Sequence, residues 1–181
     1  SLPVPSDTPF PPHIFVFCDG NKFLQPPTHG RHHVRAFSEP EAAHYVAQHC
    51  PRLLPAYIAL VPMAYKSDAF RACALYTEGG VYVDDDIVID AAYFDLLDSS
   101  SLGGAVLFDD KDVDYTGGFL YLNWRYTRDF DVWNALLAFR QPHHPLLRCV
   151  LDAIIDNVKR RRSDIGNLDV SGPGAFGRCY N

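Results

Sequence analysis

The sequence predicts an α/β protein of three layers, α/β/α, with a mixed central sheet. Short apolar runs rich in aromatic and β-branched residues alternate along the chain with segments of helical pattern. The 181 residues suffice for one domain with a sizeable core, and neither repeats nor a long linker divide them. Apolar residues make up 48% and charged residues 21% of the chain, which is a globular composition.

The first elements follow a proline-rich, extended lead-in (SLPVPSDTPFPP). Residues 13–18 (HIFVFC) form a first strand, which ends at the turn sequence DGN. Residues 33–37 (HVRAF) alternate in polarity as a second strand does. Ser38 and Glu41 have the spacing of a capping box, so a helix is expected to follow them.

The clearest helix covers residues 67–78 (SDAFRACALYTE). Ser67 is its expected N-cap, and Gly79 and Gly80 are expected to end it, because glycine adopts the backbone conformations that follow a helix. Residues 81–83 (VYV) then form a strand that leads into three adjacent aspartates.

The second half of the chain continues the alternation. Residues 105–108 (AVLF) and 118–122 (GFLYL) are predicted strands, and residues 131–139 form either a short helix or a strand. Residues 145–162 predict a long amphipathic helix, because Pro145 suits a first helical turn. The final residues, SGPGAFGRCYN, form a glycine-rich tail.

Charge and cysteine content limit the classes of function. The net charge of −6 argues against nucleic acid as the main partner. The five cysteines are scattered and form no CxxC pair, so we expect small core residues and no zinc site or dense disulfide framework. No apolar run approaches the roughly 20 residues of a membrane span. Ser1 is not a natural start, so an anchor or targeting segment is one explanation for what precedes it.

Asp84, Asp85 and Asp86 interrupt an otherwise strand-like apolar run. Burial and mutual repulsion make three such carboxylates costly unless a positive group lies beside them. On an extended segment the first and third side chains point to one side, so Asp84 and Asp86 form a pair. Two converging carboxylates at a strand end are a hard oxygen site that suits Mn²⁺ or Mg²⁺, with phosphate oxygens completing the shell.

Residues from Asp68 to Asp86 resemble the motif of glycosyltransferases with a DXD sugar-binding region, which include mannosyltransferases and the glucosylating clostridial toxins. The pattern is D-x-x-R-x-x-x-L-x-x-x-G-G-x-Y-x-D-x-D, and every specified position is met in register. Asn134 and the later His144-Pro145 pair are similar to a second family segment, and the sequence SGP near the end resembles a late family turn.

The resemblance implies a GT-A fold that spans residues 1–181 as a single domain, either a compact enzyme or part of a longer protein. It also implies a nucleoside-diphosphate sugar donor, with UDP-sugars favoured, and a divalent metal, Mn²⁺ or Mg²⁺. The expected reaction transfers a hexose or similar sugar to a hydroxyl of a glycan, glycoprotein or glycolipid, with retention at the anomeric carbon. No nucleic acid partner and no membrane span in this chain are expected.

By motif position, Asp86 is the expected direct metal ligand, and Asp84 would contact the ribose and sugar and reach the metal directly or through water. Asp68 and Arg71 would hold hydroxyls of the donor sugar. The candidate catalytic residues are Asp68, Arg71, Asp84 and Asp86. The candidate donor-binding residues are Phe17, Cys18, Asp68, Arg71, Tyr82, Asp84, Asp85 and Asn134.

Two other interpretations of the acidic segment stay open. VYVDDDIVI also fits the strand and D-x-D-x-V pattern of haloacid-dehalogenase-like phosphatases, in which Asp84 would be the nucleophile. A module that binds a nucleotide sugar without turnover is the other interpretation. The location would be the Golgi or another secretory lumen if an anchor was removed, and the cytoplasm otherwise.

Overall fold

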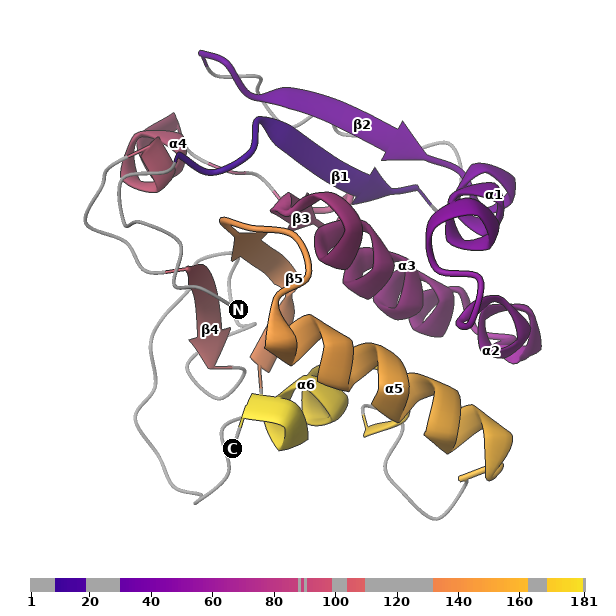
Figure 1. Cartoon of the computed structure of the whole chain (residues 1–181). Coiled ribbons are helices and arrows are strands. Elements are labelled where there is room, and N and C mark those ends of the chain that lie inside the picture. The colour runs from indigo at the N-terminus through magenta and orange to yellow at the C-terminus, as the bar shows by residue number, and fades with distance from the viewer. Residues whose placement is uncertain are drawn as a thin grey trace.

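The computed structural model describes residues 9–18, 30–87, 89, 91–98, 104–109, 132–162 and 169–180. These residues confirm the predicted α/β class, with a mixed sheet whose strand order is β2-β1-β3-β5-β4 (Figure 1). The strands are β1 (His13–Phe17), β2 (His33–Phe37), β3 (Gly80–Val83), β4 (Ala105–Asp109) and β5 (Val132–Phe139). The helices are α1 (Glu39–His49), α2 (Leu54–Ala59), α3 (Met63–Glu78), α4 (Ala91–Asp98), α5 (Pro145–Lys159) and α6 (Pro173–Tyr180).

The direction of the strands places the acidic segment. Strand β1 is parallel to both β2 and β3, whereas β5 is antiparallel to both β3 and β4. Val83 at the end of β3 pairs with Leu136 of β5, and the Asp84 amide donates to the Ala135 carbonyl at 2.9 Å. The carboxyl end of β3 and the beginning of β5 therefore meet at one edge of the sheet.

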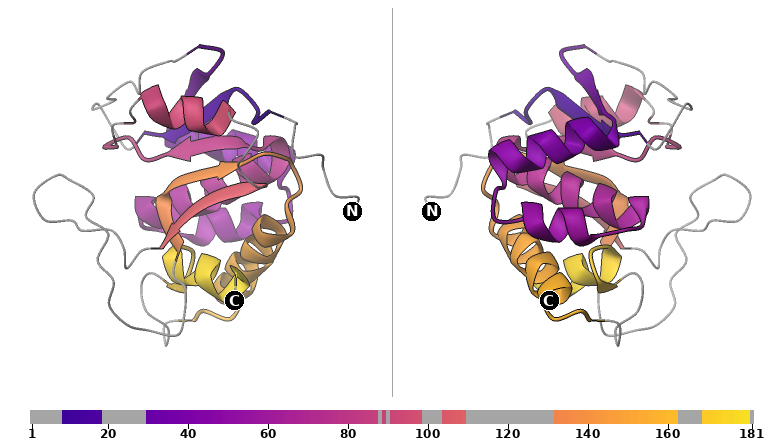
Figure 2. Two further views of the ribbon diagram at one scale, coloured as in Figure 1. Left: turned by 90° about the vertical axis from the view of Figure 1, so that its left-hand side faces the viewer. Right: turned by 90° about the vertical axis from the view of Figure 1, so that its right-hand side faces the viewer.

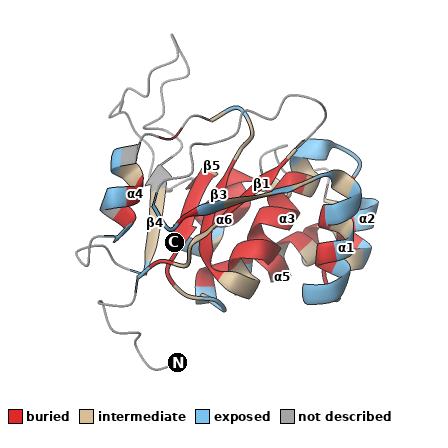
Figure 3. Cartoon of the chain, turned by 90° about the horizontal axis from the view of Figure 1, so that it is seen from above, coloured by how far each residue is buried: buried red, intermediate tan, exposed pale blue. Residues whose placement is uncertain are grey.

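Successive strand residues point to opposite faces of the sheet, and each face packs against helices, which gives the three layers. Phe15 and Tyr82 belong to a large core with α1, α2, α3, α5 and α6. Ile14 and Val81 belong to a second core, which includes Phe94 of α4. Views from the two sides show helices beside the sheet (Figure 2), and the view from above, coloured by burial, shows the buried residues concentrated in the strands and the helices next to them (Figure 3).

Several predicted boundaries are confirmed, and one is wrong. The capping box exists, because Glu41 accepts hydrogen bonds from both the amide (2.8 Å) and the hydroxyl (2.6 Å) of Ser38. Ser67 does not cap α3, which begins at Met63 after the extended Pro62. Ser67 lies one turn inside the helix, and its hydroxyl donates to the Ala64 carbonyl at 2.8 Å. The apolar residues before it extend the helix toward its N-terminus.

The double glycine ends α3 as predicted. Gly79 and Gly80 have φ values of 69° and 92°, a region that side chains with a Cβ rarely adopt. A Cβ on Gly80 would lie 2.6 Å from the His13 carbonyl oxygen. This close approach lets the chain leave the helix and enter the centre of the sheet beside β1, which sets where the acidic segment emerges.

Other elements differ from the expectations. Residues from Val132 onward form a strand, which resolves the alternative left open for 131–139, and the glycine-rich tail contains helix α6. Four cysteines form the disulfides Cys50–Cys73 and Cys149–Cys179, so most of them are cross-links and not isolated core residues. The expected strand 118–122 lies outside the described residues. Among the described helices, none is long and apolar enough to cross a membrane.

Candidate functional site

Five of the predicted residues come together at the sheet edge where β3 ends and β5 begins. Asp68 and Arg71 lie on α3, Tyr82 and Asp84 on or just after β3, and Asn134 on β5. Asp68, Arg71 and Asn134 are 7%, 3% and 7% exposed, and Tyr82 is fully buried. The side chain of Asp84 keeps 30% exposure, so the cluster opens to solvent there.

Arg71 is the centre of this cluster. Its Nη2 lies 3.2 Å from Asp68 Oδ1 and 3.1 Å from Asp84 Oδ1, so one guanidinium joins the two carboxylates. Its Nη2 also donates to Ser67 Oγ at 2.9 Å, and its Nη1 donates to the Asn134 carbonyl. The planar fork of arginine donors suits such multiple contacts, whereas a lysine has no equivalent geometry.

Asp68 is held by donors from distant parts of the chain. Asn134 Nδ2 donates to its Oδ1 at 2.8 Å, and Ser171 Oγ donates to its Oδ2 at 2.8 Å. These two residues are 66 and 103 positions away in the sequence. The packing of β5 and of the segment before α6 against α3 therefore determines the direction of this carboxylate.

Tyr82 holds the Asp84 carboxylate by a hydrogen bond. Its hydroxyl donates to Asp84 Oδ1 at 2.8 Å, and its ring lies 4.4 Å from the Arg71 guanidinium carbon, a cation–π distance. The described contacts of the Asp84 carboxylate thus restrain Oδ1, because Tyr82 and Arg71 both reach that atom.

Burial controls the ionisation of the cluster. It raises the pKa of Asp68 above its ordinary value, although the neighbouring Arg71 and the hydrogen bonds from Ser171 and Asn134 favour the charged form. Burial alone would lower the pKa of Arg71, but Asp84, Tyr82 and Asp68 together raise it, so the guanidinium stays charged. Burial also raises the pKa of the Tyr82 hydroxyl, which stays a neutral donor.

The remaining acidic residues are more open. Asp86 is exposed, and Asp85 is partly buried. The Asp85 charge adds to burial in raising the pKa of the Cys18 thiol, so Asp85 faces the end of β1. Strand β3 ends at Val83, and Asp85 and Asp86 lie in a turn in which the Ile87 amide donates to the Asp84 carbonyl at 3.2 Å, so the predicted extended backbone through the three aspartates is wrong.

Phe17 and Cys18 lie at the end of β1, next to β3. The Phe17 ring is 4% exposed and packs 5.9 Å from the Phe70 ring, so it belongs to the core. Cys18 is a free, partly buried cysteine whose amide donates to the Phe37 carbonyl at 2.9 Å. The structure therefore places these two beside the acidic segment without a described hydrogen bond to the Arg71 cluster.

The carboxylates at this edge fit a divalent metal of the hard type. Asp84 is partly buried and Asp86 is exposed, so carboxylate oxygens of the kind that such a metal prefers are accessible at this edge. In the described part of the chain no group of three or more His, Cys, Asp and Glu side chains is arranged around a common metal position. A metal held here would therefore take its other ligands from water or phosphate.

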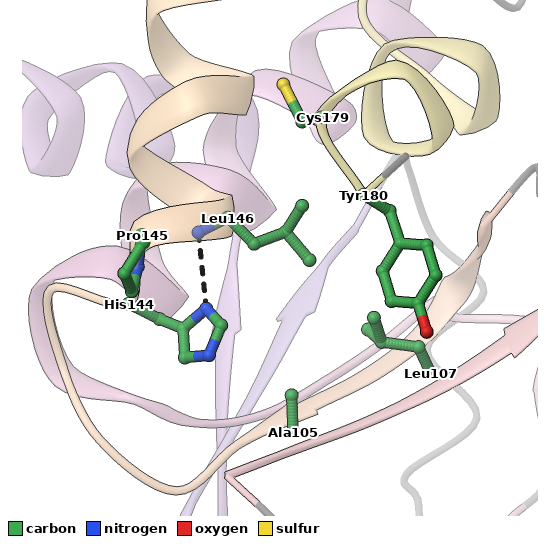
Figure 4. Close-up of a pocket in the computed structure, with 7 residues that line it drawn as sticks. All are labelled: Ala105, Leu107, His144, Pro145, Leu146, Cys179 and Tyr180. Atoms are coloured by element: carbon green, nitrogen blue, oxygen red, sulfur yellow. Dashed lines mark hydrogen bonds between the residues drawn. The ribbon is translucent and has the colours of Figure 1, made fainter. Parts of the chain in front are cut away.

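A separate cavity of about 500 Å³ lies between β4, the start of α5 and α6 (Figure 4). His144, Cys179 and Tyr180 are among its lining residues, and none of the Arg71 cluster is. Most of the described residues that line the cavity are apolar, and none of them is an Asp, Glu, Lys or Arg that would bind a sugar diphosphate or its metal.

Ser67 and Ser171 belong to the cluster but were not among the predicted site residues. Ser171 is fully buried and lies in the SGP segment that the sequence marked only as a turn. A local pattern signals a turn, but it does not say which distant side chain the turn contacts.

A mixed sheet covered on both faces, with acidic residues at the end of a central strand, defines a protein of GT-A-like fold. Residues 20–102 match a family model described as glycosyltransferase sugar-binding region containing DXD motif. The match includes the whole motif from Asp68 to Asp86, so the chain is similar to this glycosyltransferase region where the motif predicted it, over a little less than half of its length.

A solved structure titled PaToxG Glycosyltransferase is similar in fold. The similarity has a TM-score of 0.59 at 16% sequence identity and covers 94% of this chain and 68% of that chain. At such low identity the similarity supports the fold alone. No curated protein matches the sequence.

Proposed function

We propose that this chain is a metal-dependent glycosyltransferase that uses a nucleoside-diphosphate sugar, with UDP-sugars favoured. The observation that carries the proposal is the cluster in which Arg71 joins Asp68 and Asp84 at the end of β3. Buried carboxylates held in fixed directions suit the recognition of sugar hydroxyls, and the exposed Asp86 beside them suits a metal and phosphate.

Asp68, Asp84 and Asp86 differ in solvent exposure, and we assign each of them a different role on that basis. Asp86, the most open, would hold Mn²⁺ or Mg²⁺ at the diphosphate. Asp84, with 30% of its side chain exposed, would contact the ribose and the sugar. Asp68, more deeply placed, would accept hydrogen bonds from sugar hydroxyls at its accessible edge. Arg71 would orient both carboxylates, since its donors are already engaged within the protein.

The reaction is the transfer of the donor sugar to an acceptor hydroxyl of a glycan, glycoprotein or glycolipid. A bound metal would stabilise the negative charge that grows on the leaving nucleoside diphosphate. Asp84 and Asp68 would stabilise positive charge on the sugar and hold its orientation. We propose retention at the anomeric carbon, with the acceptor attacking from the side that the diphosphate leaves.

The contacts of Asp84 favour this function over a phosphatase. Tyr82 donates to Asp84 Oδ1 and Arg71 faces the same atom, and both contacts withdraw electron density from the carboxylate that a phosphatase would use as its nucleophile. Strand β3, which Asp84 follows, pairs with the antiparallel strand β5, as in the mixed sheet that the glycosyltransferase interpretation predicts.

The two disulfides bear on the location. Disulfides form and persist in oxidising compartments and are rare in the cytoplasm. Cys50–Cys73 and Cys149–Cys179 therefore favour a secretory or extracellular location over the cytoplasmic alternative.

Calorimetry with UDP, UDP-glucose, UDP-galactose, UDP-N-acetylglucosamine, GDP and GDP-mannose, with and without Mn²⁺, tests the proposal. We expect Mn²⁺-dependent binding of at least one nucleotide, which Asp86→Asn abolishes and Asp152→Asn, an exposed control on α5, leaves unchanged. Absence of nucleotide binding to the wild-type chain would reject the proposal. Binding of a nucleotide sugar without hydrolysis or transfer would instead support the non-catalytic module.

A further inference from the structure

The segment before α6 has a position that other parts of the chain fix in detail. Asn157, a buried residue of α5, donates from Nδ2 to the Val170 carbonyl at 2.9 Å and to the Asp169 carbonyl at 3.3 Å. Arg178 of α6 donates to the Asp169 carbonyl at 2.6 Å and to its carboxylate at 2.5 Å. Residues 169 and 170 are thus tied to both helices, immediately before Ser171.

A disulfide also joins α5 and α6. Cys149 lies in the first half of α5 and Cys179 in the last turn of α6. Phe176, between Arg178 and the turn, is fully buried in the core that α3 and α5 share. In the close-up of Figure 4, Cys179 of α6 lies beside α5, farther along that helix than Pro145 and Leu146.

Ser171 connects this helix pair to the donor site. It is fully buried, and its hydroxyl donates to Asp68 Oδ2 at 2.8 Å, the oxygen that Arg71 Nη2 and Asn134 Nδ2 do not contact. A buried carboxylate that loses one of its donors must either turn toward another or remain incompletely satisfied, and both changes alter its direction.

We propose that Ser171 is a positioning residue of the donor site, which orients Asp68 from a place fixed by the disulfide-linked α5–α6 pair. The α5–α6 pair then acts on the site without contacting the donor. Reduction of Cys149–Cys179 would loosen this pair, so the direction of Asp68 depends on a disulfide at the end of α6 that is farther from Ser171. The sugar-binding part of the inference rests on the proposed function, whereas the link between the disulfide and Asp68 does not.

The link is tested without any ligand by a double-mutant cycle on thermal unfolding. Ser171→Ala should lower the midpoint by several degrees in the wild-type chain, as expected for a lost hydrogen bond to a buried carboxylate. In a chain with both Cys149→Ala and Cys179→Ala the same change should shift the midpoint by less than half as much. Ser38→Ala is the matched control, because it also removes a hydroxyl that donates to a carboxylate, and its effect should be equal in both backgrounds.

Equal effects of Ser171→Ala in the two backgrounds would overturn the role of the disulfide. If the chain without Cys149–Cys179 does not fold, Asn157→Ala replaces it in the cycle, because it removes the contacts to residues 169 and 170 and keeps the disulfide. In this cycle too, a smaller effect of Ser171→Ala in the Asn157→Ala background supports the link, and an equal effect contradicts it.

The orienting role is tested with the UDP-sugar that binds the wild-type chain best, and with UDP, both in Mn²⁺. Ser171→Ala should raise the dissociation constant of the UDP-sugar about tenfold, the value of one such hydrogen bond, and that of UDP by less than twofold. Ser171→Thr, which keeps the hydroxyl, should restore most of the affinity. Equal losses for the sugar nucleotide and UDP would show that Ser171 acts on the fold in general and would overturn the orienting role. Should the wild-type chain bind no nucleotide, the proposed function fails, and the unfolding cycle still decides the link.

Discussion

Replacing Arg71 by methionine is the most informative perturbation of the Arg71 cluster. Methionine keeps a long apolar stem but removes the charge between Asp68 and Asp84. In the wild-type chain the guanidinium lies 3.2 Å from Asp68 and 3.1 Å from Asp84, and only 4% of the arginine side chain is exposed. Removing one partner of a buried ion pair costs about 3–5 kcal/mol of unfolding free energy, because the other charge stays buried without compensation.

The structure narrows this range. Asp84 has 30% of its side chain exposed and can turn to water, whereas Asp68 has 10% and cannot. Most of the cost therefore comes from Asp68, and we expect a loss of about 3 kcal/mol in urea unfolding at pH 7. Arg148→Met is the matched control, since it breaks a solvent-exposed pair with Asp152, whose loss should change the stability far less.

The loss should depend on pH in a defined direction. Burial already raises the pKa of Asp68 in the folded chain. A carboxyl with a raised pKa stabilises the fold below its unfolded pKa, and this contribution disappears as pH increases through the folded pKa. Removing Arg71 raises the folded pKa further, so the loss should be larger at pH 7 than at pH 4.

The double variant Asp68→Asn, Arg71→Met should recover part of the loss, because it leaves no buried charge at position 68. If Arg71→Met cost no more than Arg148→Met, or if its cost were the same at both pH values, the assignment of Arg71 as the compensating charge of Asp68 would be wrong.

Three further predictions concern the fold around the site. Gly80→Ala should cost about 1–3 kcal/mol of unfolding free energy, because its φ is 92° and the new Cβ would lie 2.6 Å from the His13 carbonyl oxygen, while Gly104→Ala, with no atom within 4 Å of its Cβ, should be nearly neutral. Burial acts to raise the pKa of Glu78, but hydrogen bonds from Tyr45 and Arg35 bring it below the ordinary value. The stability that Glu78 contributes is therefore present above its unfolded pKa and lost as pH falls through the folded pKa. A Glu78→Gln chain should lose less stability on acidification than the wild type, and equal acid sensitivity would contradict this. Thiol titration of the unfolded, unreduced chain should find one reactive thiol, Cys18, and reduction should cost about 3 kcal/mol for each disulfide, whereas three or more reactive thiols before reduction would exclude the two pairings.

The boundaries of several elements in the first half of the chain were predictable because their signals are local. The capping box at Ser38, the turn at Gly79 and Gly80 and the strand after them depend on neighbouring residues, and the structure contains all three. The expected pairing of Asp84 with Asp86 on an extended segment was not confirmed, because β3 ends at Val83 and a turn from Asp84 to Ile87 contains Asp85 and Asp86. The start of α3 was misplaced because a serine that suits an N-cap also fits inside a helix, where its hydroxyl bonds to the preceding turn.

By itself, the sequence determined the α/β class, the helix–glycine–strand unit from Asp68 to Asp86 and the resemblance to sugar-binding glycosyltransferases, because each depends on spacing along one short segment. The tertiary structure alone decided which residues complete the site. Asn134 and Ser171 contact Asp68 across 66 and 103 residues, and the cysteines pair across 23 and 30. Such contacts follow from the packing of α3 against β5 and α6, and packing between distant segments leaves no periodic signal in the chain. The same packing explains how the chain accommodates a partly buried carboxylate at the end of β3: Arg71, brought there by α3, lies between Asp84 and Asp68 of its own helix.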